Sequence, residues 1–176
     1  LKIEIVSDVV CPWCVIGFRN LKKAIKELEN ELSFEISWKP YELHPEIPED
    51  GYDKELYMQQ KFGSSRGSGV YDEIVGIGKD LEFDFNFSKT KRIPNTFLAH
   101  RLLWYAEQKN IQNELSEALF YAYFTDGKDV GAVEVLAKIA SGVGFDESDV
   151  ITFLESDIGA KEVENQELDS IERSIG

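Results

Sequence analysis

Hydrophobic and polar residues near the N-terminus follow three patterns in succession, and each predicts one structural element. Residues 2–7 are rich in β-branched side chains, which predicts a short strand. An apolar stripe in steps of three or four then predicts an amphipathic helix, and its members are Phe18, Leu21, Ile25, Leu28 and Leu32. From residue 34 the pattern changes to period two, which predicts a second strand over residues 34–43. Strand, helix and strand in this order predict a right-handed βαβ unit with two parallel strands.

A proline-rich segment over residues 42–51 follows the second predicted strand, and it contains His44. The carboxyl ends of two parallel strands meet at the same edge of a sheet. We therefore expect His44 to lie near the loop that follows the first strand.

The chain from residue 52 to residue 156 is expected to be mostly helical. Apolar periodicity predicts helices over 53–62, 70–81, about 112–124, 131–143 and 147–156, and a charged helix over 158–174. A turn rich in Gly and Ser over residues 63–69 separates the first two, and Phe83, Phe85 and Phe87 alternate with polar residues in a short extended stretch. A further helix is predicted after Pro94, with Asn95 as its N-cap and His100 beside its apolar stripe.

Composition narrows the class of protein. A chain of 176 residues with 43% hydrophobic and 12% aromatic residues can bury one core, or one core with a sizeable insertion. The formal charge of −14, from 33 acidic and 19 basic residues, argues against nucleic acid and anionic membrane surfaces as partners. No apolar run approaches the roughly 18 residues that predict a membrane span. We expect a cytoplasmic protein because no signal peptide is present, although Leu1 is not a start methionine and trimming of the N-terminus stays open.

The two cysteines of the chain, Cys11 and Cys14, stand three residues apart directly after the first predicted strand. Counted backwards, the apolar stripe reaches both, which places the two thiols on one face of the helix with Cys11 in its first turn. A helix N-terminus favours an anion, so Cys11 is expected to be the more acidic thiol. Pro12 suits the first helical turn, and Pro12 and Trp13 shape the site. This arrangement predicts thiol–disulfide exchange with Cys11 as nucleophile and Cys14 as the resolving thiol.

Two other interpretations of the cysteine pair are open. Half of a zinc site would need two further ligands, but the chain has no other cysteine, and His44 and His100 show no ligand spacing. Two inert core cysteines are common in general, whereas the order strand, Cys-x-x-Cys and amphipathic helix is typical of a redox site. We therefore expect no metal and no cofactor besides the redox-active disulfide itself.

Several segments in a fixed order resemble the FrnE-type branch of the DsbA-like thioredoxin-fold oxidoreductases. The segments are SDVVCPWCVIG at 7–17, ELHP at 42–45, PNT at 94–96, AHRL at 99–102 and AYFTDG at 122–127. The resemblance implies an α/β thioredoxin-like βαβ unit with an inserted all-helical domain. Residues 1–50 would form the N-terminal βαβ part, 51–156 the helical insertion, and 157–176 a helix returning to the thioredoxin-like part. The C-terminal strands of the fold and the cis-proline loop that packs on the cysteines are expected to be missing from this chain.

The resemblance also implies a function. It implies a protein dithiol–disulfide oxidoreductase or isomerase that acts on protein or small-thiol disulfides, with glutathione as a candidate reductant. His44, Asn95 and His100 are candidates for the substrate cleft. A sheet cut after its second strand leaves an edge unpaired, and a homodimer is one arrangement that would cover it.

Two alternative functions belong to other classes. The same superfamily includes the kappa-class glutathione transferases and the 2-hydroxychromene-2-carboxylate isomerases, but those relatives typically have serine where Cys11 stands. The other alternative is a redox-inactive chaperone or binding module whose cysteines are incidental.

Overall fold

The predicted βαβ unit is present, and its two strands are parallel. The computed structural model describes residues 1–62 and 68–175. Strand β1 (Lys2–Ser7), helix α1 (Pro12–Leu28) and strand β2 (Glu35–Pro40) follow one another, and the strands pair from Lys2 with Glu35 to Ser7 with Pro40. The second strand ends at Pro40 instead of residue 43, because proline has no N–H with which to continue the ladder.

Helix α1 is buried over only part of its predicted apolar stripe. Val15, Ile16 and Phe18 are buried near its N-terminal end, whereas Leu28 is 39% exposed and Leu32, beyond the helix, is 48% exposed. The stripe therefore faces the core over its N-terminal part, and its C-terminal end is exposed to solvent.

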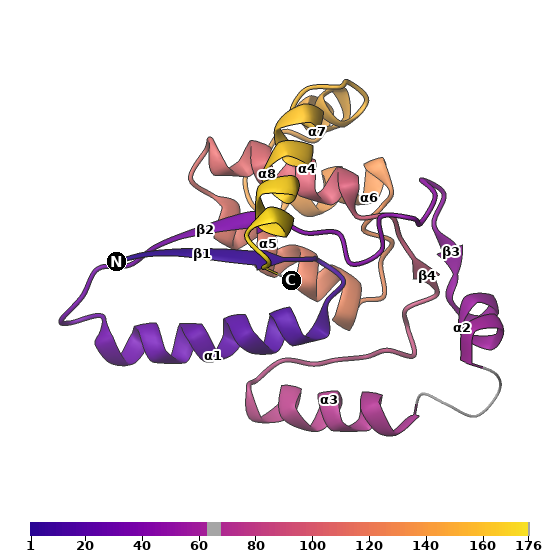
Figure 1. Ribbon diagram of the computed structural model, residues 1–176, viewed down its shortest axis with the longest axis horizontal. Helices are drawn as coiled ribbons and strands as arrows, with labels where there is room; N and C mark the ends of the chain where they lie inside the picture. Colours follow the sequence, from indigo (N-terminus) through magenta and orange to yellow (C-terminus); the bar gives the residue numbers. More distant parts are fainter. Residues whose placement is uncertain (63–67, 176) are drawn as a thin grey trace.

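Two helices of the insertion and the last helix pack against β2. Helices α4 (Phe97–Glu107), α5 (Gln112–Phe120) and α8 (Ala160–Glu172) contact β2, and α1 runs along the strand pair (Figure 1). Among the described residues β1 pairs with β2 alone, so its other edge carries no strand.

Trp38 connects the sheet to the insertion. Its ring lies 4.7 Å from the ring of Phe18 and 5.8 Å from that of Phe120, and its indole N–H donates to Asn113 Oδ1 over 2.7 Å. The side-chain amide of Gln112 accepts from the backbone N–H of Trp38 over 2.8 Å and donates to its carbonyl over 3.1 Å. Gln112 thus satisfies backbone groups that a neighbouring strand would otherwise pair with.

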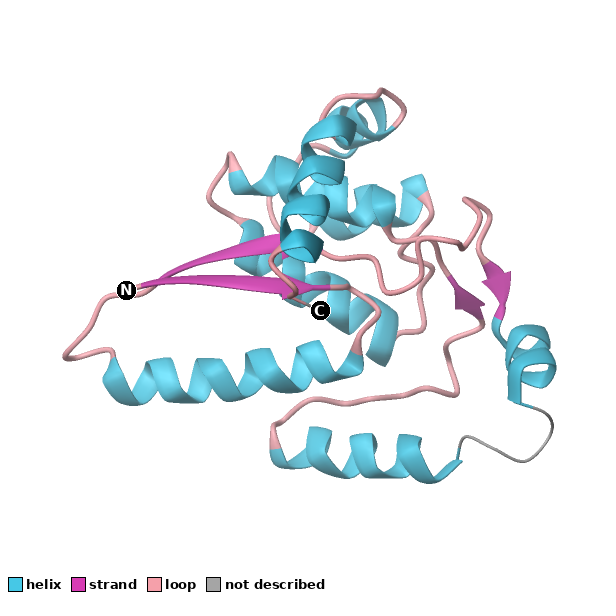
Figure 2. Cartoon of the chain, in the orientation of Figure 1, coloured by secondary structure: helices cyan, strands magenta, loops and turns pink. Residues whose placement is uncertain are grey.

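The insertion is mostly helical but not wholly so, which corrects the predicted all-helical domain. Its other helices are α2 (Lys54–Phe62), α3 (Ser68–Asp80), α6 (Val133–Ser141) and α7 (Glu147–Leu154), and α5 continues into the π-helix η1 (Tyr121–Thr125). A short antiparallel pair joins β3 (Tyr52–Asp53) to β4 (Arg92–Ile93), and Figure 2 shows it apart from the parallel strands. Two-residue strands have no readable period, which is why the sequence pattern missed them. The predicted turn over 63–69 falls mostly outside the described residues, since α3 begins at Ser68.

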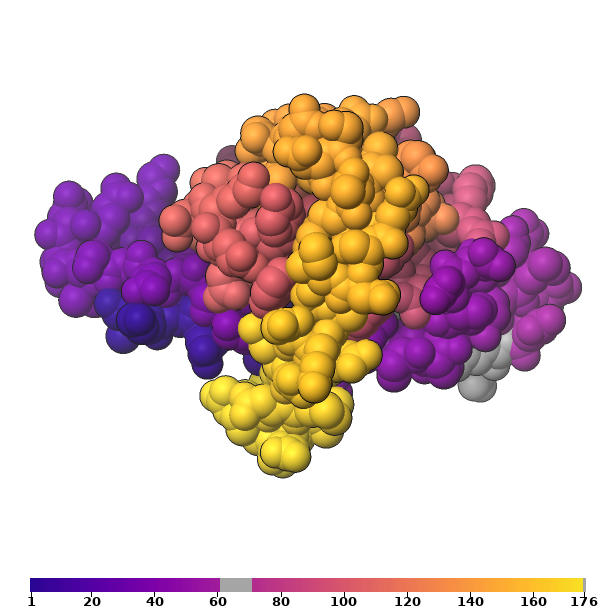
Figure 3. All heavy atoms as spheres, turned by 90° about the horizontal axis from the view of Figure 1, so that it is seen from above, coloured from indigo at the N-terminus to yellow at the C-terminus, as the bar shows by residue number. Residues whose placement is uncertain are grey.

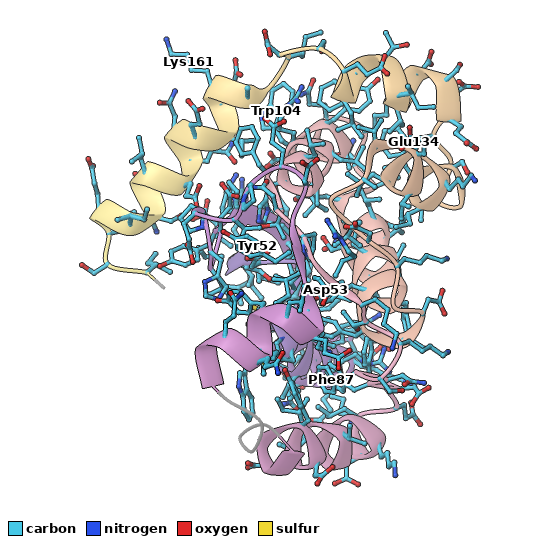
Figure 4. All side chains as sticks on the ribbon, turned by 90° about the vertical axis from the view of Figure 1, so that its right-hand side faces the viewer. Tyr52, Asp53, Phe87, Trp104, Glu134 and Lys161 are labelled. Atoms are coloured by element: carbon cyan, nitrogen blue, oxygen red, sulfur yellow. The ribbon has the colours of Figure 1, made fainter. Side chains whose placement is uncertain are left out.

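The predicted extended aromatic stretch packs into the core without forming a strand. Phe83 and Phe85 are each 4% exposed, and their rings lie 4.6 Å apart. Phe87, labelled in Figure 4, stacks on Phe85 at 5.6 Å and lies 4.5 Å from the ring of Tyr71 on α3. The alternation therefore reflects burial of aromatic side chains beneath α3.

Helix α8 crosses the molecule over β2, and its C-terminal end stands out from the surface (Figure 3). Leu168 and Ile171 near that end are 56% and 53% exposed. Its start is tied to α4: Gly159 has φ 79° and lies so close to Trp104 that a Cβ there would be 2.6 Å from the indole.

None of the described helices is both long and apolar enough to cross a membrane.

Candidate active site

The two cysteines lie one turn apart at the N-terminal end of α1. Cys11 is the N-cap residue, its backbone N–H donates to the Asp8 carbonyl over 3.1 Å, and its carbonyl accepts from the N–H of Cys14 over 3.1 Å. Pro12 opens the helix, where its missing N–H leaves no bond unmade. Both thiols are free and half-buried, and Trp13 between them is 51% exposed. The site is therefore a dithiol at the surface with an aromatic side chain beside it.

Hydrogen-bond donors surround both sulfurs. The backbone N–H groups of Trp13 and Cys14, at the open start of the helix, are directed at the Cys11 sulfur. The Ser7 hydroxyl and the backbone of Asp8 are directed at the Cys14 sulfur. Donors of this kind stabilise a thiolate on either residue.

The two thiols also share a hydrogen bond, and that bond has the largest effect on their acidity. In this arrangement Cys11 donates it, which raises the pKa of Cys11, and Cys14 accepts it, which lowers the pKa of Cys14 to about 6. Burial and the negative charge of Asp8 act in the opposite direction and raise the pKa of Cys14. The lowered pKa thus lies on Cys14 here, whereas the sequence predicts Cys11 as the more acidic thiol. Since the bond reverses when the hydrogen moves to the other sulfur, the acidic proton belongs to the pair, and the identity of the attacking sulfur stays a prediction.

Alkylation by iodoacetamide should separate the roles of the two thiols. We expect its rate to rise with pH through a midpoint near 6, because the thiolate reacts and its fraction increases with pH until the pair has lost its first proton. Mass spectrometry of the singly labelled protein should find the label on Cys11, which stands at the open end of the helix. A label on Cys14 would instead match the hydrogen-bond direction described above and reverse the predicted roles.

A buried ionisable pair lies behind the dithiol, and sequence reasoning missed one of its members. Asp8 is 2% exposed; its carboxylate accepts from the Leu43 N–H over 2.8 Å and from the Val10 N–H over 3.4 Å. His100 Nε2 lies 3.5 Å from Asp8 Oδ1. A carboxylate in a loop between strand and helix usually meets water, so its sequence position carried no signal of burial.

Two further acidic side chains lie near this pair. Burial, and after it the charge of Glu167 on α8, raises the pKa of Glu42 to about 7, although His100 acts to lower it. The backbone N–H of Glu42 donates to the Glu167 carboxylate. The segment after β2 is therefore held to the start of α1 by Asp8 and to α8 by Glu167.

The structure separates the three histidine and asparagine candidates for a substrate cleft. The His44 side chain is 42% exposed, and its Nδ1 lies 3.2 Å from Glu46 Oε1. Asn95 accepts from the Phe97 N–H over 2.9 Å and donates to the Ile47 carbonyl over 2.8 Å, so it supports the start of α4 although Thr96 is the N-cap. His100 is the one of the three that reaches the cysteine loop, and it does so from within the core. It also lines, with Ser7 and Trp38, a small pocket of about 10 Å³.

Within the described residues, no group of three or more His, Cys, Asp or Glu side chains is placed to hold a metal ion. The half-zinc-site interpretation thus finds no completing ligands in that part of the chain.

Sequence comparison finds a matching protein family and a relative of this chain. A sequence model of the DSBA-like thioredoxin domain family matches residues 2–176. The uncharacterized protein YwbO of Bacillus subtilis is 28% identical over 161 residues, which are 89% of this chain and 72% of that protein.

Solved structures share the fold. A probable DsbA oxidoreductase from Streptomyces coelicolor superposes with a TM-score of 0.87 at 25% identity, covering 98% of this chain and 75% of that one. A 2-hydroxychromene-2-carboxylate isomerase superposes with a TM-score of 0.70 at 12% identity, covering 99% of this chain and 81% of that one. The latter likeness concerns the fold alone.

Proposed function

This chain belongs to the DSBA-like thioredoxin domain family, and on that premise we propose that it is a dithiol–disulfide oxidoreductase acting through Cys11 and Cys14. Its mixed α/β fold has oxidoreductase and isomerase structures as neighbours. The observation that carries the proposal is the pair of free thiols, one turn apart at a helix N-terminus. Such a pair can exist as one thiolate and one thiol near neutral pH and can close to a disulfide.

The exchange proceeds in two substitutions at sulfur. The Cys11 thiolate attacks one sulfur of a substrate disulfide, and a mixed disulfide forms as the other substrate sulfur leaves as a thiolate. Cys14 then loses its proton and attacks the Cys11 sulfur, so that the Cys11–Cys14 disulfide forms and the second substrate thiol is released. Two electrons pass from the dithiol to the substrate, and the same steps in reverse oxidise a substrate dithiol.

The site supports specific roles for its residues. The amides of Trp13 and Cys14 hold negative charge on Cys11, and the Ser7 hydroxyl does so on Cys14. Exposed Trp13 offers an apolar contact to a substrate beside the sulfurs. We infer protein or small-thiol disulfides as substrates, glutathione as a candidate reductant, a cytoplasmic site of action, and the FrnE-type branch as the place within the family.

A second candidate function is a glutathione-dependent isomerase or transferase. The fold shared with the 2-hydroxychromene-2-carboxylate isomerase favours it, and the intact Cys-x-x-C motif argues against it. Conjugation of glutathione to a model electrophile without reduction of insulin disulfides would favour this candidate over the oxidoreductase.

Redox titration in glutathione buffers tests the oxidoreductase proposal. We expect a reversible Cys11–Cys14 disulfide with a potential between about −270 mV, as in thioredoxin, and about −120 mV, as in DsbA. The helix N-terminus stabilises the thiolate, but Pro12 and Trp13 add no positive charge between the cysteines, so stabilisation of the reduced form should be intermediate. Quantifying both forms by thiol trapping and mass spectrometry gives the value. Failure to form an intramolecular disulfide would refute the proposal.

A further inference from the structure

His100 is a buried polar side chain whose role the exchange reaction does not explain. It is 2% exposed, and its Nε2 atom has no hydrogen-bond partner among the described residues. The nearest charged atom is Asp8 Oδ1, at 3.5 Å. His100 belongs to α4 of the insertion, whereas Asp8 belongs to the loop between β1 and α1, so the contact joins the insertion to the cysteine loop.

The Asp8 carboxylate is held beside the dithiol by other bonds. It accepts from the backbone N–H groups of Leu43 and Val10, while the Asp8 carbonyl accepts from the N–H of Cys11. Its negative charge opposes a second negative charge on Cys14. A buried carboxylate whose charge acts on Cys14 therefore calls for a compensating positive charge if a thiolate is to form readily.

We propose that His100 is a positioning residue for the dithiol, which from α4 compensates the Asp8 carboxylate so that the thiolate of the Cys11–Cys14 pair does not face an unpaired negative charge. This inference rests on the proposed oxidoreductase function. It makes the insertion part of the redox site, because the charge that tunes the sulfurs is supplied from outside the βαβ unit.

The other ionisable groups described around Asp8 are acids or are paired with another residue, so they do not compensate its charge. The charge of Asp8 raises the pKa of Glu42, on the segment after β2, and the pKa of Tyr123, on η1. Both of these side chains are acids. Glu167 on α8 adds a further negative charge near Glu42. Lys39 on β2 is paired with Glu107, at 3.2 Å. Among the described residues, His100 is the basic side chain that reaches the Asp8 carboxylate, with Nε2 3.5 Å from Oδ1.

His100→Gln and Asp8→Asn each replace an ionisable side chain with a neutral amide. The two substitutions should shift the pH midpoint of thiolate formation in opposite directions. In His100→Gln the Asp8 charge is uncompensated, so the pH midpoint of thiolate formation should rise by about one unit. With a midpoint that moves from about 6 to about 7, the disulfide should then be favoured about fivefold more in the glutathione equilibrium at pH 7, because the reduced form has lost thiolate stabilisation. In Asp8→Asn the midpoint should fall and the equilibrium should move toward the dithiol. In the double variant, His100→Gln should add little to Asp8→Asn.

The readouts are thiolate absorbance near 240 nm against pH and the glutathione equilibrium, with circular dichroism and thermal melting to show that each variant folds. Glu134→Gln is the matched control: it removes one negative charge from an exposed position on α6 (Figure 4) and should leave both readouts unchanged. A merely structural role for His100 would lower the melting temperature without shifts of opposite sign.

Two outcomes would overturn the inference: an unchanged midpoint in folded His100→Gln, or shifts of the same sign in both single variants. If His100→Gln does not fold, a midpoint that fails to fall in Asp8→Asn overturns it alone. A wild-type protein that forms no Cys11–Cys14 disulfide would refute the proposed function instead, and the thiolate titration would still test the charge compensation.

Discussion

Cys11→Ser is expected to abolish the reduction of protein disulfides, lowering the initial rate of insulin reduction by about 10³-fold or more, because a serine hydroxyl does not attack a disulfide at neutral pH. Cys14→Ser should also stop turnover, but with a different chemical result. Its Cys11 can still attack the substrate, and without a resolving thiol the mixed disulfide should accumulate and be visible by intact mass.

The two serine variants serve as controls for each other, since each removes one half-buried sulfur from the same helical turn. Their melting curves should be similar, so a difference in trapping reports the roles of the sulfurs rather than folding. If Cys11→Ser trapped the substrate and Cys14→Ser did not, Cys14 would be the nucleophile. If both variants reduced insulin at the wild-type rate, the dithiol would not be the site of the chemistry.

Arg101→Met is expected to destabilise the fold strongly. Arg101 is 4% exposed, and its guanidinium donates to four backbone carbonyls around the C-terminal end of α7, those of Phe153, Leu154, Ser156 and Ile158. Methionine fills much of the space but donates nothing, so these carbonyls lose their partner. We expect a loss of about 3–5 kcal/mol in the free energy of unfolding, measured by urea titration. The melting temperature should fall by roughly 10 °C.

The control for this prediction is Arg173→Met. Arg173 is an exposed arginine near the end of α8 that pairs with Asp169 and Glu4. Surface pairs of this kind contribute little to stability, so the urea midpoint should stay at the wild-type value. Arg101→Lys should fall between the two variants, because an ammonium cannot reach several carbonyls as the planar guanidinium does. A wild-type urea midpoint in Arg101→Met would mean that those carbonyls find other donors.

Much of the fold could be predicted from local pattern. The strand over residues 2–7, helix α1 after the cysteines and the parallel return at β2 follow from period, from Pro12 and from the order of elements, all of which act over short stretches of chain. The helices of the insertion likewise match the predicted ranges within a few residues. The pair β3 and β4 could not be predicted, because its partners lie about 40 residues apart and each has only two residues.

The candidate site, like the fold, could be predicted from the sequence only in part. The presence of Cys11 and Cys14 at one helix N-terminus follows from their spacing, since a helix places residues i and i+3 side by side whatever the rest of the chain does. The groups that tune them do not follow from spacing. Asp8 becomes a buried carboxylate only because the Leu43 segment and α4 close over it, and His100 reaches it from 92 positions further along the chain, with Nε2 3.5 Å from Oδ1. Gln112 and Arg101 satisfy distant backbone groups in the same manner.

The sequence by itself therefore determined where the two thiols lie and which short elements present them, because cysteine spacing, helical period and proline position act through neighbouring residues. The tertiary structure alone decided which ionisable groups surround the sulfurs and how buried they are. Burial and charge pairing depend on distances in space between segments far apart in the chain, and these two quantities set the acidity of a thiol.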